Sequence, residues 1–476
     1  MNDRLEGFDS IFYPKSHAVI GASADLSKFG GRYLRVLLGF GYPGKVFPVN
    51  PKESEILELK AYPSVTDIPE EVDFATISVP APAVPQVVED CLAKGVKAAQ
   101  ILTSGFREMS AEGEKLEMAI SNTAAKGIRV VGPNCFGVYC PAGGVTILPG
   151  GDLPKESGPV AFISQSGGYG IRVPRRAYGW GIRFSKVISY GNACDVNECD
   201  LLEYLGQDEE TRIITAYLEG VKDGPRFFQL LKEISRVKPV ILFKGGLTQG
   251  GARAVNSHTG SLGGQEEVWN AVFKQTNAIR ANNLEELLDT MLAFMHLEPK
   301  PERKVCAMGG GGAITVTAAD ICDRLGVSLP LFSKEMEKKL LPNIPAVGAS
   351  ARNPVDMGSP GPPPHMVKAV METVLGDGVV NTIIIDEIES AASNPDGPMA
   401  KLLIETKEKF DTPIIIVLPV EAVALEFLER ESNRRKSRDY YLSEGIPVFL
   451  TLDRAVRALA NLDNYYQRRE ALSSPA

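Results

Sequence analysis

The feature that most constrains the fold of this chain is a recurring unit, an apolar run that ends in glycines and leads into a helical stretch. It occurs at His17–Ser23, at Gly158–Gly168 and at Lys304–Ala313. Short apolar runs that alternate with helical stretches predict buried parallel strands connected by helices. We therefore expect an α/β protein whose doubly wound parallel sheets bind ligands at the carboxyl ends of their strands.

The pattern predicts three such blocks, over residues 1–150, 151–300 and 301–476, which suits the length of the chain. A proline-rich, charged segment at Leu297–Arg303 predicts a linker before the third block. In the first block we expect further strands at 45–50, 73–80, 98–103 and 129–132, and helices at 29–40, 83–95 and 113–127.

Charge and cysteine content exclude several classes of protein. The net charge of -8 argues against general binding to nucleic acid or to a membrane surface, and no apolar run approaches membrane-spanning length. The N-terminus lacks the order of a signal peptide. Seven cysteines are scattered without metal-ligand spacing, which predicts free thiols, no metal site and a cytoplasmic location.

The first glycine turn favours a nucleotide with a phosphate on its ribose. The turn begins at Gly21 and is not the G-x-G-x-x-G of NAD-binding proteins. The second expected strand ends at Asn50, followed by Lys52, where an NAD site carries an acid. Because a lysine attracts phosphate, both NADP and coenzyme A (CoA) fit this turn. The alternative is a sheet domain that binds no nucleotide.

Two other glycine turns are candidate anion sites. Ser164–Gly168 and Gly309–Gly312 each follow an apolar run and precede a helical stretch. Free backbone N–H groups and the positive end of a helix dipole bind anions at such turns. For the four glycines at Gly309–Gly312 the alternative is a tight turn without a ligand, in which glycine lets the helix pack closely on the strand.

A histidine and a glutamate suggest the chemistry. His258 is one of only four histidines and lies in the small, polar stretch 254–264, for which we expect a mobile loop. Glu219 ends an apolar run, where active-site groups collect in parallel sheets. An imidazole nucleophile, oriented by a carboxylate beside a phosphate cradle, predicts phosphoryl transfer through a phosphohistidine. The alternatives are a solvated histidine and a solvated strand-end acid.

The order of the motifs resembles that of the nucleoside-diphosphate-forming acyl-CoA synthetases, relatives of succinyl-CoA synthetase, and more narrowly that of their α subunit. The similarity covers nearly the whole chain. Its motifs are Val19–Ser23, Pro48–Lys52, Ser78–Ala81, Gly132–Cys135, Ile163–Gly167, Tyr217–Gly220, Ser257–Gly260, Gly309–Gly312 and Asn353–Asp356.

The resemblance implies a Rossmann-like CoA-binding domain followed by two flavodoxin-like ligase domains. It implies that His258 is phosphorylated, with Glu219 as its partner. The phosphate would be held by Ser164, Ser166, Gly167, Gly168, Gly310, Gly311 and Gly312. CoA would be bound by Gly21, Ala22, Ser23, Lys28, Asn50, Lys52, Val79, Pro80, Ser104, Asn134 and Cys135.

The reaction implied by the resemblance is the reversible conversion of acid, CoA and ATP to acyl-CoA, ADP and phosphate, through an acyl phosphate and a phosphohistidine. ATP and Mg²⁺ would bind an ATP-grasp β subunit, because no stretch of this chain remains for that module. We expect an α2β2 heterotetramer, or a homodimer when the chain is isolated. A non-catalytic CoA-binding or regulatory subunit is the first alternative, and an NADP-dependent oxidoreductase the second.

One segment departs from the family pattern. After Gly168 the chain carries Arg172, Pro174, Arg175 and Arg176, where relatives have a small apolar helix. Proline predicts a break or a kink in a helix. The arginines indicate either a solvated basic face or an altered acyl pocket or docking surface.

Overall fold

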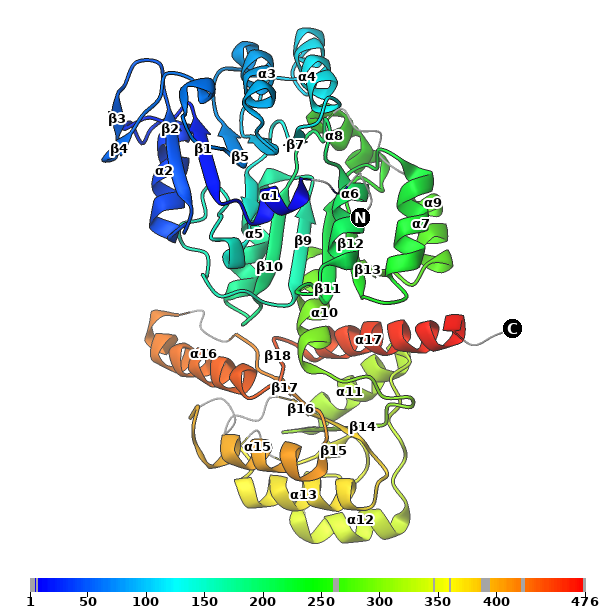
Figure 1. The fold of residues 1–476 in the computed structure, drawn as a ribbon. Coiled ribbons are helices and arrows are strands. Elements are labelled where there is room, and N and C mark those ends of the chain that lie inside the picture. The colour runs from blue at the N-terminus through cyan, green and yellow to red at the C-terminus, as the bar shows by residue number, and fades with distance from the viewer. Residues whose placement is uncertain are drawn as a thin grey trace. The chain divides into compact units, whose positions relative to one another are not determined.

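The computed structural model describes residues 5, 7–259, 265–345, 347–358, 361–386, 394–420 and 424–473. They contain two five-stranded sheets and one six-stranded sheet, with helices between the strands, which confirms the predicted α/β class (Figure 1). The chain divides into two compact units. Residues 1–287 hold the first two sheets, and residues 288–476 hold the third.

The first sheet is wholly parallel, with the strand order β2-β1-β5-β6-β7. Its strands are β1 (Ser16–Ile20), β2 (Lys45–Val49), β5 (Phe74–Ile77), β6 (Ala98–Ile101) and β7 (Arg129–Val131), and its helices are α2 (Phe29–Phe40), α3 (Val84–Lys94) and α4 (Ala111–Ala124). A short hairpin of β3 (Glu55–Ile56) and β4 (Leu59–Lys60) follows β2. The order reverses between β1 and β5, and parallel sheets bind ligands at such a switch point.

The second sheet has the order β13-β12-β11-β9-β10-β8. It contains β8 (Gly137–Tyr139), β9 (Val160–Ser164), β10 (Phe184–Ser189), β11 (Ile213–Leu218), β12 (Val240–Lys244) and β13 (Ile279–Ala281). The expected boundary at residue 150 does not follow the sheets, because β8 precedes it and pairs antiparallel with β10. The side chain of Gln100, on β6, accepts a hydrogen bond from the backbone N–H of Val138 at 3.0 Å and so connects β8 to the first sheet.

Five helices accompany the second sheet along the chain. They are α5 (Gly167–Tyr178), α6 (Glu198–Gln207), α7 (Gly224–Ile234), α8 (Gln249–Thr259) and α9 (Glu266–Gln275). Helix α10 (Leu284–His296) follows β13, and the two units divide within it. The two units therefore divide before the predicted linker at Leu297–Arg303. Arg303 is only 5% exposed and its Nε donates to the Asp463 carboxylate at 2.8 Å, so this segment is anchored in the second unit.

The third sheet is parallel, with the order β15-β14-β16-β17-β18. Its strands are β14 (Val305–Gly309), β15 (Val355–Asp356), β16 (Thr382–Asp386), β17 (Ile414–Val417) and β18 (Val448–Phe449). Its longer helices are α11 (Gly312–Leu325), α13 (Pro364–Gly376), α15 (Pro398–Phe410), α16 (Leu428–Ser443) and α17 (Leu452–Ser473). The strands are almost entirely buried, as apolar runs without alternation predict.

All seven cysteines are free thiols, as predicted. Within the described part of the chain, no helix is both long enough and apolar enough to cross a membrane.

Candidate active site

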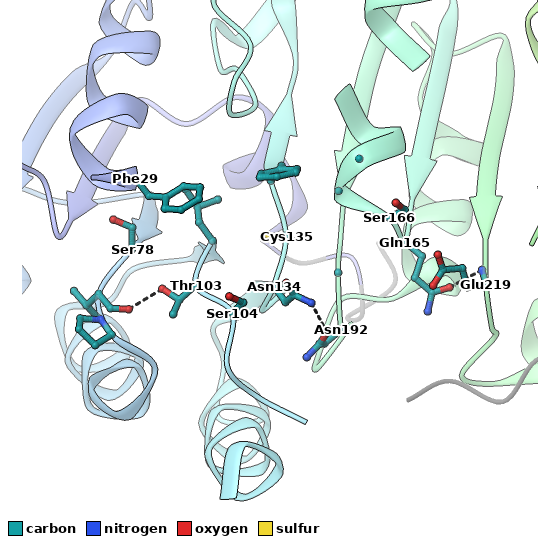
Figure 2. A pocket seen from close by; sticks show the side chains of 17 residues that line it. Phe29, Ser78, Thr103, Ser104, Asn134, Cys135, Gln165, Ser166, Asn192 and Glu219 are labelled. Atoms are coloured by element: carbon teal, nitrogen blue, oxygen red, sulfur yellow. Dashed lines mark hydrogen bonds between the residues drawn. The ribbon is translucent and has the colours of Figure 1, made fainter. Parts of the chain in front are cut away.

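A pocket of about 550 Å³ lies in the first unit, at the carboxyl ends of strands from its two sheets (Figure 2). Loops that follow β5, β6, β7, β9, β10 and β11 all contribute to it. The lining residues are Phe29, Ser78, Val79, Pro80, Leu102, Thr103, Ser104, Asn134, Cys135, Phe136, Gln165, Ser166, Gly167, Gly168, Gly191, Asn192 and Glu219. The pocket thus combines predicted CoA-binding residues with predicted phosphate-binding residues and Glu219.

Asn134 lies on the first-sheet side of the pocket in a left-handed conformation, with φ of 58°. Asparagine tolerates this conformation better than most residues. Its side-chain amide donates to Asn192 Oδ1 at 3.3 Å, and Asn192 Nδ2 donates to Glu108 and Glu117 at 2.7 and 2.8 Å. Sequence reasoning missed Asn192, whose sequence neighbourhood carries no motif. The two asparagines fix the loop after β7 against the loop after β10.

The first glycine turn lies outside the pocket lining, although it ends β1 at the same edge of the sheet. A Cβ on Gly30 would meet the carbonyl oxygen of Gly21 at 2.0 Å, so the start of α2 approaches this turn closely. Asn50 Nδ2 donates to the carbonyl of Ala22 at 2.8 Å, and Asn50 Oδ1 accepts from the backbone of Lys52 at 2.9 Å. The remaining members of the predicted set outside the lining are Ser23, which is buried, and Lys28, which is exposed.

Cys135 lines the pocket but does not offer a reactive thiol. It is only 4% exposed, and its Sγ donates to the carbonyl of Ile101 at 3.2 Å. Burial raises the pKa of this thiol to about 12, so it stays protonated and unreactive. Cys135 therefore shapes the floor of the pocket by packing.

The start of α5 is the turn predicted to bind an anion, and it lies on the second-sheet side of the pocket. Ser166 is the N-cap, and Ser166, Gly167 and Gly168 all line the pocket. A Cβ on Gly167 would lie 2.6 Å from Cδ2 of Phe136, which explains the glycine there. Ser164 is fully buried and donates to the carbonyl of Ser166 at 2.6 Å, so it shapes the turn and does not line the pocket.

Helix α5 continues through Pro174 to Tyr178, so of the two outcomes expected for this proline, a break or a kink, the break is wrong. Proline crowds the carbonyl four residues earlier, here that of Gly170, but Pro174 is buried and its packing offsets that cost. The three arginines are exposed and none lines the pocket. Arg175 and Arg176 pair with Asp152 and Glu285 at 2.8 Å, as a solvated basic face would.

Glu219 directly follows β11. One of its carboxylate oxygens accepts a hydrogen bond, and the other has no partner among the described residues. Its backbone N–H, and that of Gly220, donate to Gln165 Oε1 at 2.8 and 2.9 Å, which fixes the turn. Glu219 Oε1 accepts from the hydroxyl of Tyr217 at 3.2 Å. Glu219 Oε2 is buried and has no hydrogen-bond partner among the described residues. A buried carboxylate oxygen without a partner is costly, which makes Glu219 a candidate functional group.

Lys244 lies behind this turn and was missed by sequence reasoning, because it ends an apolar run without any motif. It is 5% exposed, its Nζ donates to the carbonyl of Glu219 at 2.8 Å and also to that of Gly245, and it lies over the ring of Trp269. Burial lowers the pKa of Lys244 to about 8, despite the nearby negative charge of Glu219. Lys244 and Gln165 together hold the Glu219–Gly220 turn from both sides.

The stretch around His258 is helical up to residue 259, so the expected loop is wrong there. Helix α8 (Gln249–Thr259) starts after Thr248, whose hydroxyl accepts from the backbone N–H of Gly251 at 3.1 Å. Threonine is a favoured N-cap, and the residues that follow contain no proline to end the helix. The side chain of His258 and residues 260–264 lie outside the described part of the structure, so the predicted role of His258 stays a prediction.

The other histidines differ from one another in burial. His17 is fully buried, its Nε2 lies 2.7 Å from Thr76 Oγ1, and burial lowers its pKa to about 3. Burial likewise lowers the pKa of His296 to about 4. His365, in α13, is exposed. His17 and His296 are therefore structural residues held in the neutral form.

The glycine turn at Gly310–Gly312 belongs to the second unit, where it connects β14 to α11. Gly311 has φ of 147° and ψ of 153°, a conformation that only glycine readily adopts. This helix start carries no side-chain cap, and its binding of an anion stays a prediction.

Comparison with known proteins matches both halves of the first unit. The CoA binding domain family matches residues 15–141, and the succinyl-CoA ligase like flavodoxin domain family matches residues 157–294. The α subunit of ADP-forming acetate–CoA ligase I from Pyrococcus furiosus is 39% identical, over 95% of this chain and 96% of that one. ADP-forming acetate–CoA ligase I from Archaeoglobus fulgidus is 38% identical over 96% of this chain, which spans 63% of that longer protein.

A solved structure shows the similarity in three dimensions over nearly the whole chain. Acetyl-coenzyme A synthetase 1 of Ca. Korarchaeum cryptofilum, in complex with phosphate and ADP, superposes with a TM-score of 0.84 at 31% identity. The match covers 98% of this chain and 99% of that one.

Proposed function

The chain belongs to the ADP-forming acetate–CoA ligase family, as an α subunit, and from this premise we propose how it performs the chemistry of an acid–thiol ligase. The reversible reaction converts acid, CoA and ATP to acyl-CoA, ADP and phosphate. In the direction of acyl-CoA formation, His258 carries a phosphoryl group that passes to the acid. The CoA thiol then attacks the carbonyl of the acyl phosphate and releases phosphate.

The observation that carries this proposal is the open carboxylate oxygen beside an anion cradle. Glu219 Oε2 is buried without a partner, and Glu219 lines the same pocket as the start of α5. A carboxylate that accepts an imidazole N–H leaves the other ring nitrogen as the nucleophile. The backbone N–H groups of Gly167 and Gly168 then stabilise the charge on the phosphoryl oxygens. Gly310–Gly312 is proposed as the second cradle.

We place CoA on the first sheet, with its reactive end in the pocket. Val79, Pro80, Ser104, Asn134 and Cys135 line that pocket, and Lys52 lies exposed at the same edge of the sheet. Lys52→Ala should weaken CoA binding about tenfold by removing a charge from the ribose phosphate. The matched control is 3′-dephospho-CoA, which lacks that phosphate and should lose little affinity. Equal losses for both ligands, measured by calorimetry, would contradict this placement.

The nucleotide, with Mg²⁺, is proposed to bind a separate ATP-grasp β subunit in an α2β2 assembly. The Pyrococcus relative, which this chain matches over nearly its full length, is itself named as an α subunit. No G-x-x-x-x-G-K-[ST] motif is present in this sequence to hold a triphosphate. The purified chain alone should release no ADP in the presence of CoA and a panel of acids, and adding the partner should restore turnover. Turnover by the chain alone, with the partner excluded by mass spectrometry, would contradict the proposal.

The decisive experiment is labelling with acetyl phosphate that carries radioactive phosphorus. The full chain should acquire a label that is labile in acid and stable in base, as a phosphohistidine is. His258→Ala should abolish the label, and Glu219→Gln should slow its appearance at least tenfold. His365→Ala is the matched control, since that histidine is exposed in α13 and should change nothing. A label that persists in His258→Ala would refute the assignment.

A further inference from the structure

Tyr217 is positioned to act on the Glu219 carboxylate from two residues away. Its hydroxyl donates to Glu219 Oε1 at 3.2 Å, and Glu219 Oε2 is left without a partner in the described structure. Side chains at i and i+2 of extended backbone share one face, and Glu219 directly follows β11, so the two side chains lie on the same side of the chain. The bond commits one oxygen of the carboxylate and leaves the other open.

The phenol ring is held in place by its neighbours. The Tyr169 ring stacks on it with centroids 4.3 Å apart, and Phe243 packs edge-on at 5.2 Å. The hydroxyl lies against the backbone of Gly245, where a Cβ would come within 2.7 Å of Tyr217 Oη. The ring therefore has little freedom, and a side chain at position 245 would displace the hydroxyl.

The Tyr217 hydroxyl stays protonated near neutral pH and therefore remains a hydrogen-bond donor. Burial, and after it the negative charge of Glu219, raise the pKa of Tyr217 above its usual range. A protonated phenol can donate only one hydrogen bond, and the Glu219 carboxylate accepts it.

We propose that Tyr217 is a positioning residue for phosphoryl transfer, whose hydroxyl fixes the Glu219 carboxylate through Oε1 so that Oε2 accepts the imidazole N–H of His258. This inference rests on the proposed function of His258 and Glu219. In the step concerned, the lone pair of the free imidazole nitrogen forms the N–P bond. The bond from phosphorus to the acyl oxygen breaks, and its electron pair leaves on the carboxylate of the released acid. The proton on the other imidazole nitrogen stays there, hydrogen-bonded to Glu219.

The test compares single-turnover phosphorylation of the full chain by acetyl phosphate in matched variants. Tyr217→Phe keeps the stacked ring and removes the hydroxyl, so the rate constant at saturating acetyl phosphate should fall about tenfold, as for a lost hydrogen bond to a charged group. The half-saturating concentration should change less than twofold. Tyr169→Phe removes the hydroxyl of the other ring in the stack and should leave both parameters unchanged.

Two further variants distinguish positioning from packing. In the Glu219→Gln background, Tyr217→Phe should have no additional effect, because residues that act as one unit are not additive. Gly245→Ala should reproduce the loss of rate by displacing the hydroxyl, and the double variant with Tyr217→Phe should be no slower than Tyr217→Phe alone, because the hydroxyl is then absent.

The outcomes separate this inference from the proposed function. A Tyr217→Phe rate within twofold of wild type, or fully additive losses with Glu219→Gln, would overturn the role of Tyr217 alone. A label that survives His258→Ala would overturn the proposed function as well. If Tyr217→Phe failed to fold, Gly245→Ala would decide, since a normal rate in that variant would also overturn the inference.

Discussion

The two glycine turns that precede α5 and α11 share one sequence signature but need glycine for different reasons. At α5, Gly167 is required by space, since an added Cβ would lie 2.6 Å from the Phe136 ring. At α11, an added Cβ on Gly311 meets no described atom within 4 Å, and glycine is required by a φ of 147°. The first helix start is capped by Ser166, whereas the second has no side-chain cap. A glycine-rich motif therefore predicts a helix start without revealing which constraint selected the glycines.

The largest effect is expected for Gly311→Ala. The backbone of Gly311 lies in a region that side chains other than glycine hardly enter, at a cost of about 2–3 kcal/mol. The strain cannot be relieved by turning a side chain, so the whole turn must move. Thermal unfolding of the third sheet should shift accordingly, and Gly312→Ala, whose added Cβ would make only an ordinary contact, is the control. An unchanged midpoint of thermal unfolding in Gly311→Ala would contradict the claim that the backbone conformation requires glycine at this position.

Gly167→Ala should cost less, about 1–2 kcal/mol, because the Phe136 ring can turn away from the added methyl. Denaturant unfolding would measure the loss. The double variant Gly167→Ala with Phe136→Leu should recover most of the stability if the clash is the cause. Equal instability with and without Phe136→Leu would show that the backbone of Gly167 is the constraint after all.

Lys244, which is buried behind the Glu219–Gly220 turn, should make the stability of the chain depend on pH. The pKa of Lys244 is lowered to about 8 in the folded chain from 10.5, so above pH 8 the unfolded chain binds more protons than the folded one. The free energy of unfolding should therefore rise between about pH 8 and 10.5, with a slope of at most about 1.4 kcal/mol per pH unit, relative to Lys244→Met at each pH. Urea unfolding across that range tests this. A difference between the two chains that stays flat, or falls with pH, would contradict the lowered pKa of Lys244 in the folded chain.

The smallest effects are expected at the glycines next to the constrained ones. An added Cβ would lie 3.7 Å from Ser166 Oγ at Gly168 and 3.5 Å from Asp356 Oδ2 at Gly312, which are ordinary contacts. Alanine at either position should change the free energy of unfolding by less than about 0.5 kcal/mol, because favourable helix propensity offsets minor crowding. A loss as large as that of Gly167→Ala would show that the whole turn is constrained, not single residues.

Much of the fold was predictable from the apolar runs alone. The five strands of the first sheet occur at the predicted places because buried parallel strands need continuous apolar sequence. The failures arose where local rules compete with context. Helix α5 tolerates Pro174 because packing buries it, and α8 forms where small polar residues suggested a loop. The charged residues of the expected linker were misread because Asp463, 160 residues away, pairs with Arg303.

The sequence by itself determined the α/β class, the family and the identities of the pocket residues that carry motifs, because each of these is written in local patterns and their order. Only the tertiary structure decided which of those residues meet. Glu219 and Gln165 are 54 residues apart, yet they form one turn, and Asn134 meets Asn192 across 58 residues. The positions of Lys244 and Gly245 beside the site, and the contact of Tyr217 with Glu219, were likewise invisible in the sequence. Hydrogen bonds and burial depend on distances in space, and a linear pattern specifies those only through the complete fold.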